Sequence, residues 1–280
     1  KLKELHDKIG EPSPYAAILV GDGDSMGTTI DEIKTKEGHI AFGNRLSTFA
    51  EEASRIVDNH SGSLIYSGGD DVMAYLPLHN LLEASNELQT AFTKTISEAV
   101  KEADITPTHQ PTFSAGIAIV HHSEDLGNAL NLARNGEHLA KEQGGRNALA
   151  IIQQNHNGAP RKIHYKWDMA YAVLENVVSL CQEGQLPSTL PYQLIGIGKQ
   201  CGYDIKWSPK TNTPQNAATV CALRRINAKD FDKDTMNKIS NMLVNHSDLR
   251  QLAQTIIIAR QIADSKCMAI GNSASTEEQK

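Results

Sequence analysis

The chain has 280 residues, of which 40% are hydrophobic and 21% charged, a globular composition with room for one large domain or two smaller ones. Its formal net charge of -6 excludes a protein that coats nucleic acid through overall positive charge, although a local basic patch stays compatible with it. No apolar run reaches the roughly 18 residues of a transmembrane helix and no signal segment opens the chain, so we expect a cytoplasmic protein without membrane contact.

Residues 1–155 alternate short apolar runs with longer amphipathic patterns. The apolar runs predict strands over Tyr15–Val20, Ser63–Ser67, Val72–Leu76, Phe113–Val120 and Ala148–Ile152. Apolar residues at helical spacing predict helices over Arg45–Val57, Leu81–Val100 and Leu126–Gln143. The first six of these strands and helices follow the order of a ferredoxin-like domain. We expect an α+β sheet with the first strand beside the hairpin, parallel neighbours joined by helices, and cover mainly on one face.

The composition changes at Gln154–Arg161, a polar stretch with Gly and Pro that predicts a linker. Beyond it no strand is convincing, and the patterns are helical over Asp168–Cys181, Asp232–Val244 and Leu249–Ala263. We therefore predict an α+β domain at residues 1–155, an all-α domain at residues 162–271 and a disordered Ser/Thr/Glu-rich tail at residues 272–280.

The cysteines lie far apart and form no CxxC pair, at positions Cys181, Cys201, Cys221 and Cys267. This spacing fits neither a zinc knuckle nor a disulfide framework. We expect reduced thiols that act as small buried hydrophobic residues.

Two acidic stretches stand where the expected topology brings them together. Asp22 and Asp24 follow the first strand, and Asp70 and Asp71 form the hairpin turn. Converging carboxylates repel one another unless they bind a hard cation such as Mg²⁺ or Mn²⁺. The glycines beside them are Gly21, Gly23, Gly68 and Gly69. These can adopt positive φ or admit a ligand to the backbone, and the Gly23 carbonyl could be a further metal ligand. Ordinary turn chemistry is the alternative.

The segment Lys141–Asn147 closes a predicted helix and leads into a strand. One interpretation is a glycine helix cap with basic residues near the negative end of the helix dipole. The other places Lys141 and Arg146 against the triphosphate of a metal-bound nucleotide. Such a site would catalyse nucleotidyl transfer, in which a 3′-hydroxyl attacks the α-phosphate of ATP and expels pyrophosphate.

Four segments together resemble the palm domains of nucleotidyl cyclases, namely Asp22–Gly27, Gly68–Asp71, Ser114–Ile119 and Ala140–Asn147. They are most similar to the second palm of the large subunit of type III CRISPR–Cas effector complexes, which has a GGDD turn, a DGDxMG strand end and an SAGIAI strand. The resemblance covers residues 15–155. The remainder fits the family's C-terminal helical domain by position and composition.

The resemblance implies an enzyme that makes cyclic oligoadenylates from ATP when its complex binds target RNA. Carried over to this sequence, it assigns metal binding and catalysis to Asp22, Asp70 and Asp71. The Gly23 carbonyl would be a further metal ligand. The remaining residues of the nucleotide site would be Asp24, Ser47, Gly68, Gly69, Lys141 and Arg146. Among these, Lys141 would bind phosphate. Ser47, in a stretch that resembles the first helix of that palm, would contact adenine.

Such subunits work inside a ribonucleoprotein, so we expect ATP, other subunits and, mostly indirectly, crRNA and target RNA as partners. They also carry an upstream nuclease-like domain and another palm, and their active site lies between the two palms. Because this sequence starts at Lys1 and shows one palm pattern, we expect a C-terminal fragment that is inactive or weak without the missing palm.

Two alternatives stay open. One is a GGDEF-type dinucleotide cyclase, which the Val72-Met73 pair after the turn disfavours. The other is a scaffold subunit with a silent palm, which the intact set of Asp22, Asp70 and Lys141 disfavours.

Overall fold

The computed structural model describes residues 12–155, 158–201, 203 and 248–277. The chain divides into two compact units, Lys1–Ala172 with Met268–Lys280 and Val173–Cys267. The predicted helix over Asp232–Val244 lies outside the described residues. Across the described ranges, none of the helices combines the length and the apolar character that crossing a membrane would require.

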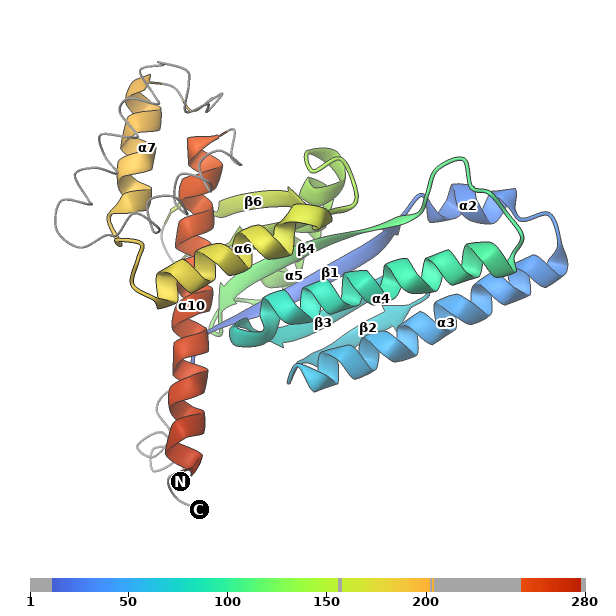
Figure 1. Ribbon diagram of the computed structural model, residues 1–280, viewed down its shortest axis with the longest axis horizontal. Coiled ribbons are helices and arrows are strands. Elements are labelled where there is room, and N and C mark those ends of the chain that lie inside the picture. Colours follow the sequence, from blue (N-terminus) through green and yellow to red (C-terminus); the bar gives the residue numbers. More distant parts are fainter. Residues whose placement is uncertain (1–11, 156–157, 202, 204–247, 278–280) are drawn as a thin grey trace. The chain divides into compact units, whose positions relative to one another are not determined.

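The first unit is built on a six-stranded sheet in the order β2-β3-β1-β4-β5-β6 (Figure 1). Its strands are β1 Tyr15–Asp24, β2 Ser63–Gly68, β3 Asp71–Pro77, β4 Thr112–His121, β5 Ala148–Gln153 and β6 Arg161–Lys166. The order β2-β3-β1-β4 is the ferredoxin-like arrangement and confirms that the first strand lies beside the hairpin. The expectation of parallel neighbours holds only for β4 and β5, because every other pair is antiparallel.

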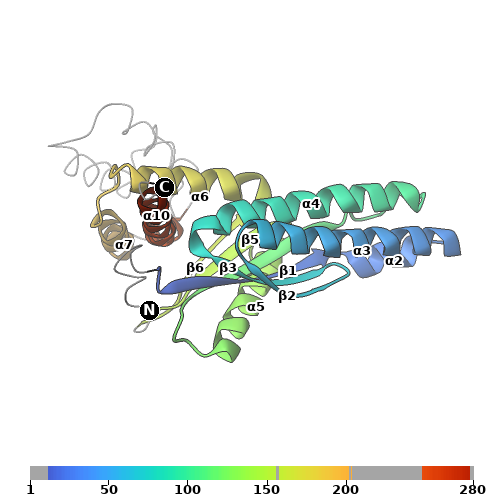
Figure 2. The same ribbon diagram turned by 90° about the horizontal axis from the view of Figure 1, so that it is seen from below.

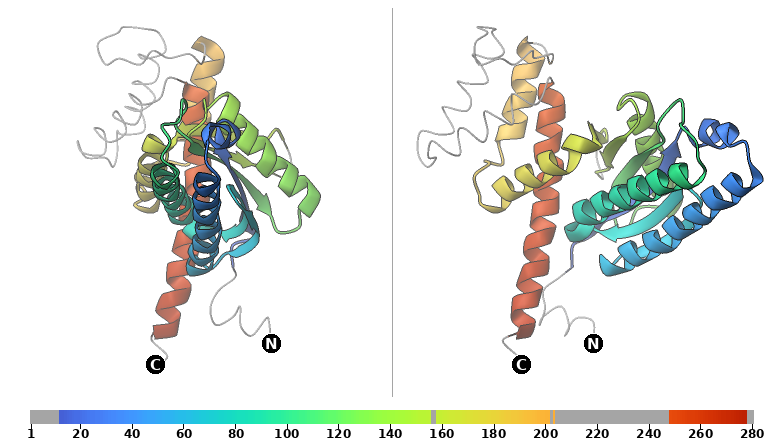
Figure 3. Two further views of the ribbon diagram at one scale, coloured as in Figure 1. Left: turned by 90° about the vertical axis from the view of Figure 1, so that its right-hand side faces the viewer. Right: turned by 45° about the vertical axis from the view of Figure 1, so that its right-hand side comes forward.

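Helices cover both faces of this sheet (Figures 2 and 3). They are α2 Met26–Glu32, α3 Lys36–Asn59, the short 3₁₀ helix η1 Leu78–Asn80, α4 Leu81–Glu102 and α5 Leu126–Glu142. α3 and α4 lie side by side on one face, and α5 lies on the other. The expected cover on mainly one face is therefore wrong. The reason is that α5 carries an alanine stripe, Ala129 and Ala133, which packs on Ile18 and Val120 of the second face.

Each face has its own core. Under α3 and α4, the rings of Phe49, Phe92 and Phe113 pack together, with centroids 5.2 Å apart for Phe49–Phe92 and 5.0 Å for Phe92–Phe113. Side-chain caps start the helices: Thr35 accepts from the Gly38 amide at 3.1 Å before α3, and Asp125 caps α5 in the same way.

α5 approaches β4 most closely at Gly116. A Cβ at this position would lie 1.9 Å from the Glu137 nitrogen and 2.3 Å from the Ala133 oxygen. Because these are backbone atoms that cannot rotate away, we expect Gly116→Ala to destabilise the fold by about 1–3 kcal/mol in chemical denaturation. Gly43→Ala on α3, where a Cβ meets nothing within 4 Å, should be neutral or stabilising by up to about 1 kcal/mol. Equal losses for both variants would contradict this account.

The sheet continues past the predicted domain boundary at residue 155. β6 is a strand in a region where we predicted a linker and then only helices, and the first compact unit extends to Ala172. In β6, Ile163 and Tyr165 are buried while Lys162 and Lys166 are exposed, which is the alternation of a strand with one covered face. Two apolar residues among four basic ones were too few to show this pattern in the sequence.

The second unit is helical where it is described, as predicted. It contains most of α6 Trp167–Gln182, all of α7 Leu190–Cys201 and most of α10 Leu249–Glu277. Its buried residues are mainly aliphatic and include Leu174, Val177, Val178, Leu252, Ile256 and Ile262. α10 runs to Glu277 through most of the predicted disordered tail, because a helix that has formed needs only propagation and no proline interrupts it here.

The described thiols are free, as predicted for Cys181 and Cys267. Burial raises the pKa of the Cys181 thiol to about 11, which makes it unreactive at neutral pH. Cys267 is exposed, so the expectation of burial is wrong there. The Cys201 and Cys221 side chains lie outside the described part.

Candidate active site

β1 continues through the residues that we predicted as a turn. Asp22 is paired with Ser114 and Asp24 with Thr112 on β4, so both aspartates belong to the strand. Side chains alternate along a strand, and Asp22 and Asp24 therefore project to the same face as Ile18, the face of α5. Gly21 makes this possible, because a Cβ there would lie 2.2 Å from the Phe113 ring.

The hairpin turn brings its own aspartates to the end of β1. Gly69 has φ 68°, the left-handed conformation predicted for it, whereas Gly21, Gly23 and Gly68 do not have positive φ. A Cβ on Gly23 would lie 2.9 Å from Oδ2 of Asp70. The missing side chain at Gly23 thus gives the Asp70 carboxylate room to lie against β1. Asp22, Asp70 and Asp71, here called the acidic cluster, meet at this point as predicted.

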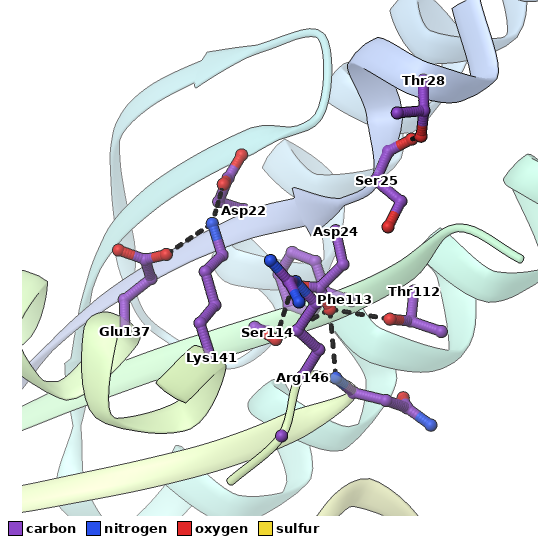
Figure 4. A network of polar contacts seen from close by, with 12 residues as sticks. Asp22, Asp24, Ser25, Thr28, Thr112, Phe113, Ser114, Glu137, Lys141 and Arg146 are labelled. Atoms are coloured by element: carbon purple, nitrogen blue, oxygen red, sulfur yellow. Dashed lines mark hydrogen bonds and ion pairs between the residues drawn. The ribbon is translucent and has the colours of Figure 1, made fainter. Parts of the chain in front are cut away.

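Lys141 supplies the positively charged side chain of this site (Figure 4). It lies in the last turn of α5, and its ammonium contacts the Asp22 carboxylate and, at 2.6 Å, Oε1 of Glu137. Burial alone would lower the pKa of Lys141, but the hydrogen bonds to Asp22 and Glu137 outweigh it and raise that pKa. Lys141 is therefore charged and held between two carboxylates.

The aspartates of the turn are less well compensated. Desolvation, followed by repulsion from Asp22, raises the pKa of Asp70. Desolvation, a hydrogen bond with Asp22 and repulsion from Asp22 and Asp70 raise the pKa of Asp71 to about 6. Lys141 lowers both values but does not cancel the effect. The acidic cluster thus keeps excess negative charge.

The raised pKa of Asp71 has a consequence for stability. In the unfolded chain this carboxyl ionises near its ordinary value of 3.8, and in the folded chain it ionises near 6. The folded state binds the proton more tightly, so this contribution to stability is present below pH 4 and is lost as the pH rises through 6. In metal-free buffer we expect Asp71→Asn to raise the melting temperature at pH 8 and to change it less at pH 4.5. A shift that is equal at both pH values would contradict this assignment.

The acidic cluster fits a hard divalent cation by its chemistry. Carboxylate oxygens are the ligands that Mg²⁺ and Mn²⁺ prefer, and three aspartates face one ammonium. Over the part of the chain that the structure describes, no three His, Cys, Asp or Glu side chains form a ready-made metal cage. Lys141 stands at the Asp22 carboxylate, so a cation bound by all three aspartates would have to displace it.

Asp24 points into the protein, away from the acidic cluster. Its carboxylate is 2% exposed and accepts hydrogen bonds from the Thr112 hydroxyl at 2.7 Å, the Ser114 hydroxyl at 2.8 Å and the Asn147 amide at 3.0 Å. Arg146 lies above it with a side chain that is 64% exposed and Nε 4.0 Å from Oδ1 of Asp24. Of the two residues predicted to contact the nucleotide, Asp24 is therefore buried inside the protein, whereas Arg146 lies at the surface.

Ser47 is not brought to the other candidates. It is exposed on α3, on the opposite face of the sheet from α5, and its hydroxyl donates to the Gly43 carbonyl at 3.1 Å. Conversely, Glu137 belongs to the site and was missed. Its spacing of four residues before Lys141 on a predicted helix was the available signal.

The chain is similar to known proteins over the residues that carry this site. The family described as Cas10/Cmr2, second palm domain, matches residues 15–150. CRISPR system Cmr subunit Cmr2 from Pyrococcus furiosus is 29% identical over an alignment of 230 residues, and the match covers 73% of this chain and 25% of that protein. The chain thus spans about a quarter of the length of this relative.

Solved structures show the same fold. A Csm1–Csm4 cassette in complex with pppApA matches with a TM-score of 0.60 at 12% identity, over 92% of this chain and 37% of that one. A cassette in complex with cA4 matches with a TM-score of 0.56 at 12% identity, over 92% and 38%. Residues 15–150, which include the acidic cluster and Lys141, therefore match the Cas10/Cmr2 second palm domain, and the chain is similar to a fragment of a type III Cas10 large subunit.

Proposed function

We propose that this palm contributes one half of a metal-dependent nucleotidyltransferase that makes cyclic oligoadenylates from ATP in a type III effector activated by target RNA. The observation that carries the proposal is the meeting of the acidic cluster with Lys141 at the end of β1. Carboxylates for a divalent cation beside a charged lysine are the parts that phosphoryl transfer requires.

The residues divide the work by their chemistry. Asp22, Asp70 and Asp71 hold Mg²⁺ or Mn²⁺, with the Gly23 carbonyl as a further ligand. Lys141 moves from Asp22 to the phosphate oxygens of ATP, where its hydrogen bonds are again charge-assisted. The bound cation supplies charge stabilisation at the phosphates. The 3′-hydroxyl oxygen of one nucleotide bonds to the α-phosphorus of the next, the bond to the β-phosphate breaks, and pyrophosphate leaves while the hydroxyl proton passes to water.

The ligands of the similar solved structures support the proposed nucleotide substrate. Solved cassettes of the same fold are complexes with pppApA and with cA4. ATP, the other palm, the other subunits, crRNA and target RNA are proposed partners, the RNAs acting mostly through other subunits. Gly68, Gly69 and Arg146 are proposed to line the nucleotide, whereas Ser47, on the opposite face of the sheet from α5, is left out of the proposed site.

Product analysis on the assembled effector tests the proposal. The complex is incubated with Mg²⁺ and target RNA and with ATP alone, GTP alone or both, and the products are identified by mass spectrometry. We expect cyclic oligoadenylates from ATP alone. A product that requires GTP would instead identify a dinucleotide cyclase. No product, together with no binding of Mg²⁺–ATP, would identify a scaffold.

A further inference from the structure

The loop Gly144–Asn147, here called the clamped loop, joins α5 to β5 in an unusual conformation. Three successive residues have positive φ, with 70° at Gly145, 60° at Arg146 and 46° at Asn147. For residues other than glycine this conformation costs on the order of 1–3 kcal/mol and persists only where the surroundings impose it. The clamped loop must therefore be held by contacts outside itself.

One side of the clamped loop is held by Asp24. The buried carboxylate accepts from the Asn147 amide at 3.0 Å, while the Thr112 and Ser114 hydroxyls fix the carboxylate itself (Figure 4). Asp24 thus fastens the end of the clamped loop to β1, the strand that also carries Asp22.

The other side is held by the junction of β6 and α6. The Lys166 ammonium donates to the carbonyls of Gly145 at 2.7 Å and Arg146 at 2.6 Å, and the Trp167 amide donates to the Asn147 carbonyl at 3.1 Å. Three successive loop carbonyls are therefore bound by two successive residues. Trp167 is itself anchored, because its indole nitrogen donates to the Phe113 carbonyl at 2.7 Å.

The clamped loop is also tied to the turn of α5 that carries the phosphate-facing lysine. The Arg146 amide donates to the carbonyls of Ala140 and of Lys141, both at 3.2 Å. A displacement of the clamped loop would consequently move the backbone of Lys141 and the side chain of Arg146 relative to the acidic cluster. Misplacement of a reacting group by about 1 Å can cost about 100-fold in rate.

We infer that Lys166 is a positioning residue for the nucleotide site: it holds the clamped loop from outside, opposite Asp24, and so sets Lys141 and Arg146 for the triphosphate. This inference rests on the proposed function. Lys166 lies beyond residues 15–150, the part matched to the palm family, and on the strand that the sequence did not reveal.

Lys166 is the better residue to test, because its side chain is exposed whereas Asp24 is buried and its replacement endangers folding. The variants are Lys166→Met, which removes the donor, Lys166→Arg, which restores one, and Lys162→Met as a control on the same strand. Two quantities are measured on the full chain: the Kd for ATP with Mn²⁺, and hydrogen exchange of peptides that cover residues 139–147.

We expect Lys166→Met to speed exchange in residues 139–147 and to weaken ATP binding by about tenfold or more, with most of both effects reversed in Lys166→Arg and absent in Lys162→Met. Faster exchange with an unchanged Kd would overturn the inference by showing a purely structural contact. Unchanged exchange would overturn it by showing that Lys166 does not hold the loop. An assembled wild-type effector that binds no ATP and makes no product would overturn the proposed function and the inference together. Wild-type ATP binding with an unchanged Kd in Lys166→Met would overturn the inference alone.

Discussion

The double variant Asp70→Ala with Asp71→Ala is expected to lose more than about 100-fold of the ATP-derived product in the assembled effector. The two residues supply most of the acidic cluster, and a catalytic metal contributes several kcal/mol, with 1.36 kcal/mol worth a factor of about ten in rate. Folding should survive, because Asp71 is exposed and because desolvation and the nearby negative charge of Asp22 already disfavour the ionised form of both carboxyls. Product yield and melting temperature are the two measurements.

The matched control removes another adjacent pair of carboxylates. Glu51→Ala with Glu52→Ala on α3 changes the net charge by the same amount on the opposite face of the sheet from α5. This variant should keep full activity. Full activity of the Asp70/Asp71 variant would contradict the metal assignment, and a collapse of its melting temperature would show that the turn supports the fold instead.

Lys141→Met is expected to change two affinities in opposite directions. Without the ammonium, Asp22 is free for a cation, so Mn²⁺ alone should bind more tightly than to the wild type. ATP in the presence of Mn²⁺ should bind about 10- to 100-fold more weakly, because a hydrogen bond to a charged group contributes about 1.5–3 kcal/mol. Titration calorimetry with Mn²⁺ and then with ATP measures both.

Glu137 provides the control for this variant. It is 9% exposed, and the loss of Lys141 would leave its carboxylate buried without its ammonium partner. The double variant Lys141→Met with Glu137→Gln removes that penalty, and Glu137→Gln alone keeps the Lys141–Asp22 contact. Weaker Mn²⁺ binding in the double variant would contradict competition between Lys141 and the metal. Unchanged ATP binding would contradict the phosphate role.

The local patterns of the sheet could be predicted from the sequence. The hairpin turn at Gly69 and the apolar run that opens β1 depend on neighbouring residues, and both were found at their predicted places. The run of β1 through Asp24 was missed, since it depends on pairing with β4, nearly 90 residues later, where Asp24 pairs with Thr112. β6 was missed because basic residues on its exposed face outnumber the apolar ones on its buried face.

The candidate site shows the same division. Motifs pointed to Asp22, Asp70, Asp71 and Lys141, and the structure brings these together. The motif could not tell which aspartate of the DGD segment joins the acidic cluster and which is buried. That distinction needs the donors at Thr112, Ser114 and Asn147, which come from two other parts of the chain. Lys166 lies outside every motif and is found only through its contacts.

Titration of ATP into the wild-type chain, with Mn²⁺ and again with a chelator, tests the central claim most directly. If the acidic cluster and Lys141 form a metal-dependent nucleotide site, ATP binds with Mn²⁺, does not bind with the chelator, and does not bind to the Asp70→Ala, Asp71→Ala variant. ATP binding that is the same with and without the metal, or no ATP binding by the wild type at all, would contradict the claim that this palm holds a metal-dependent nucleotide site.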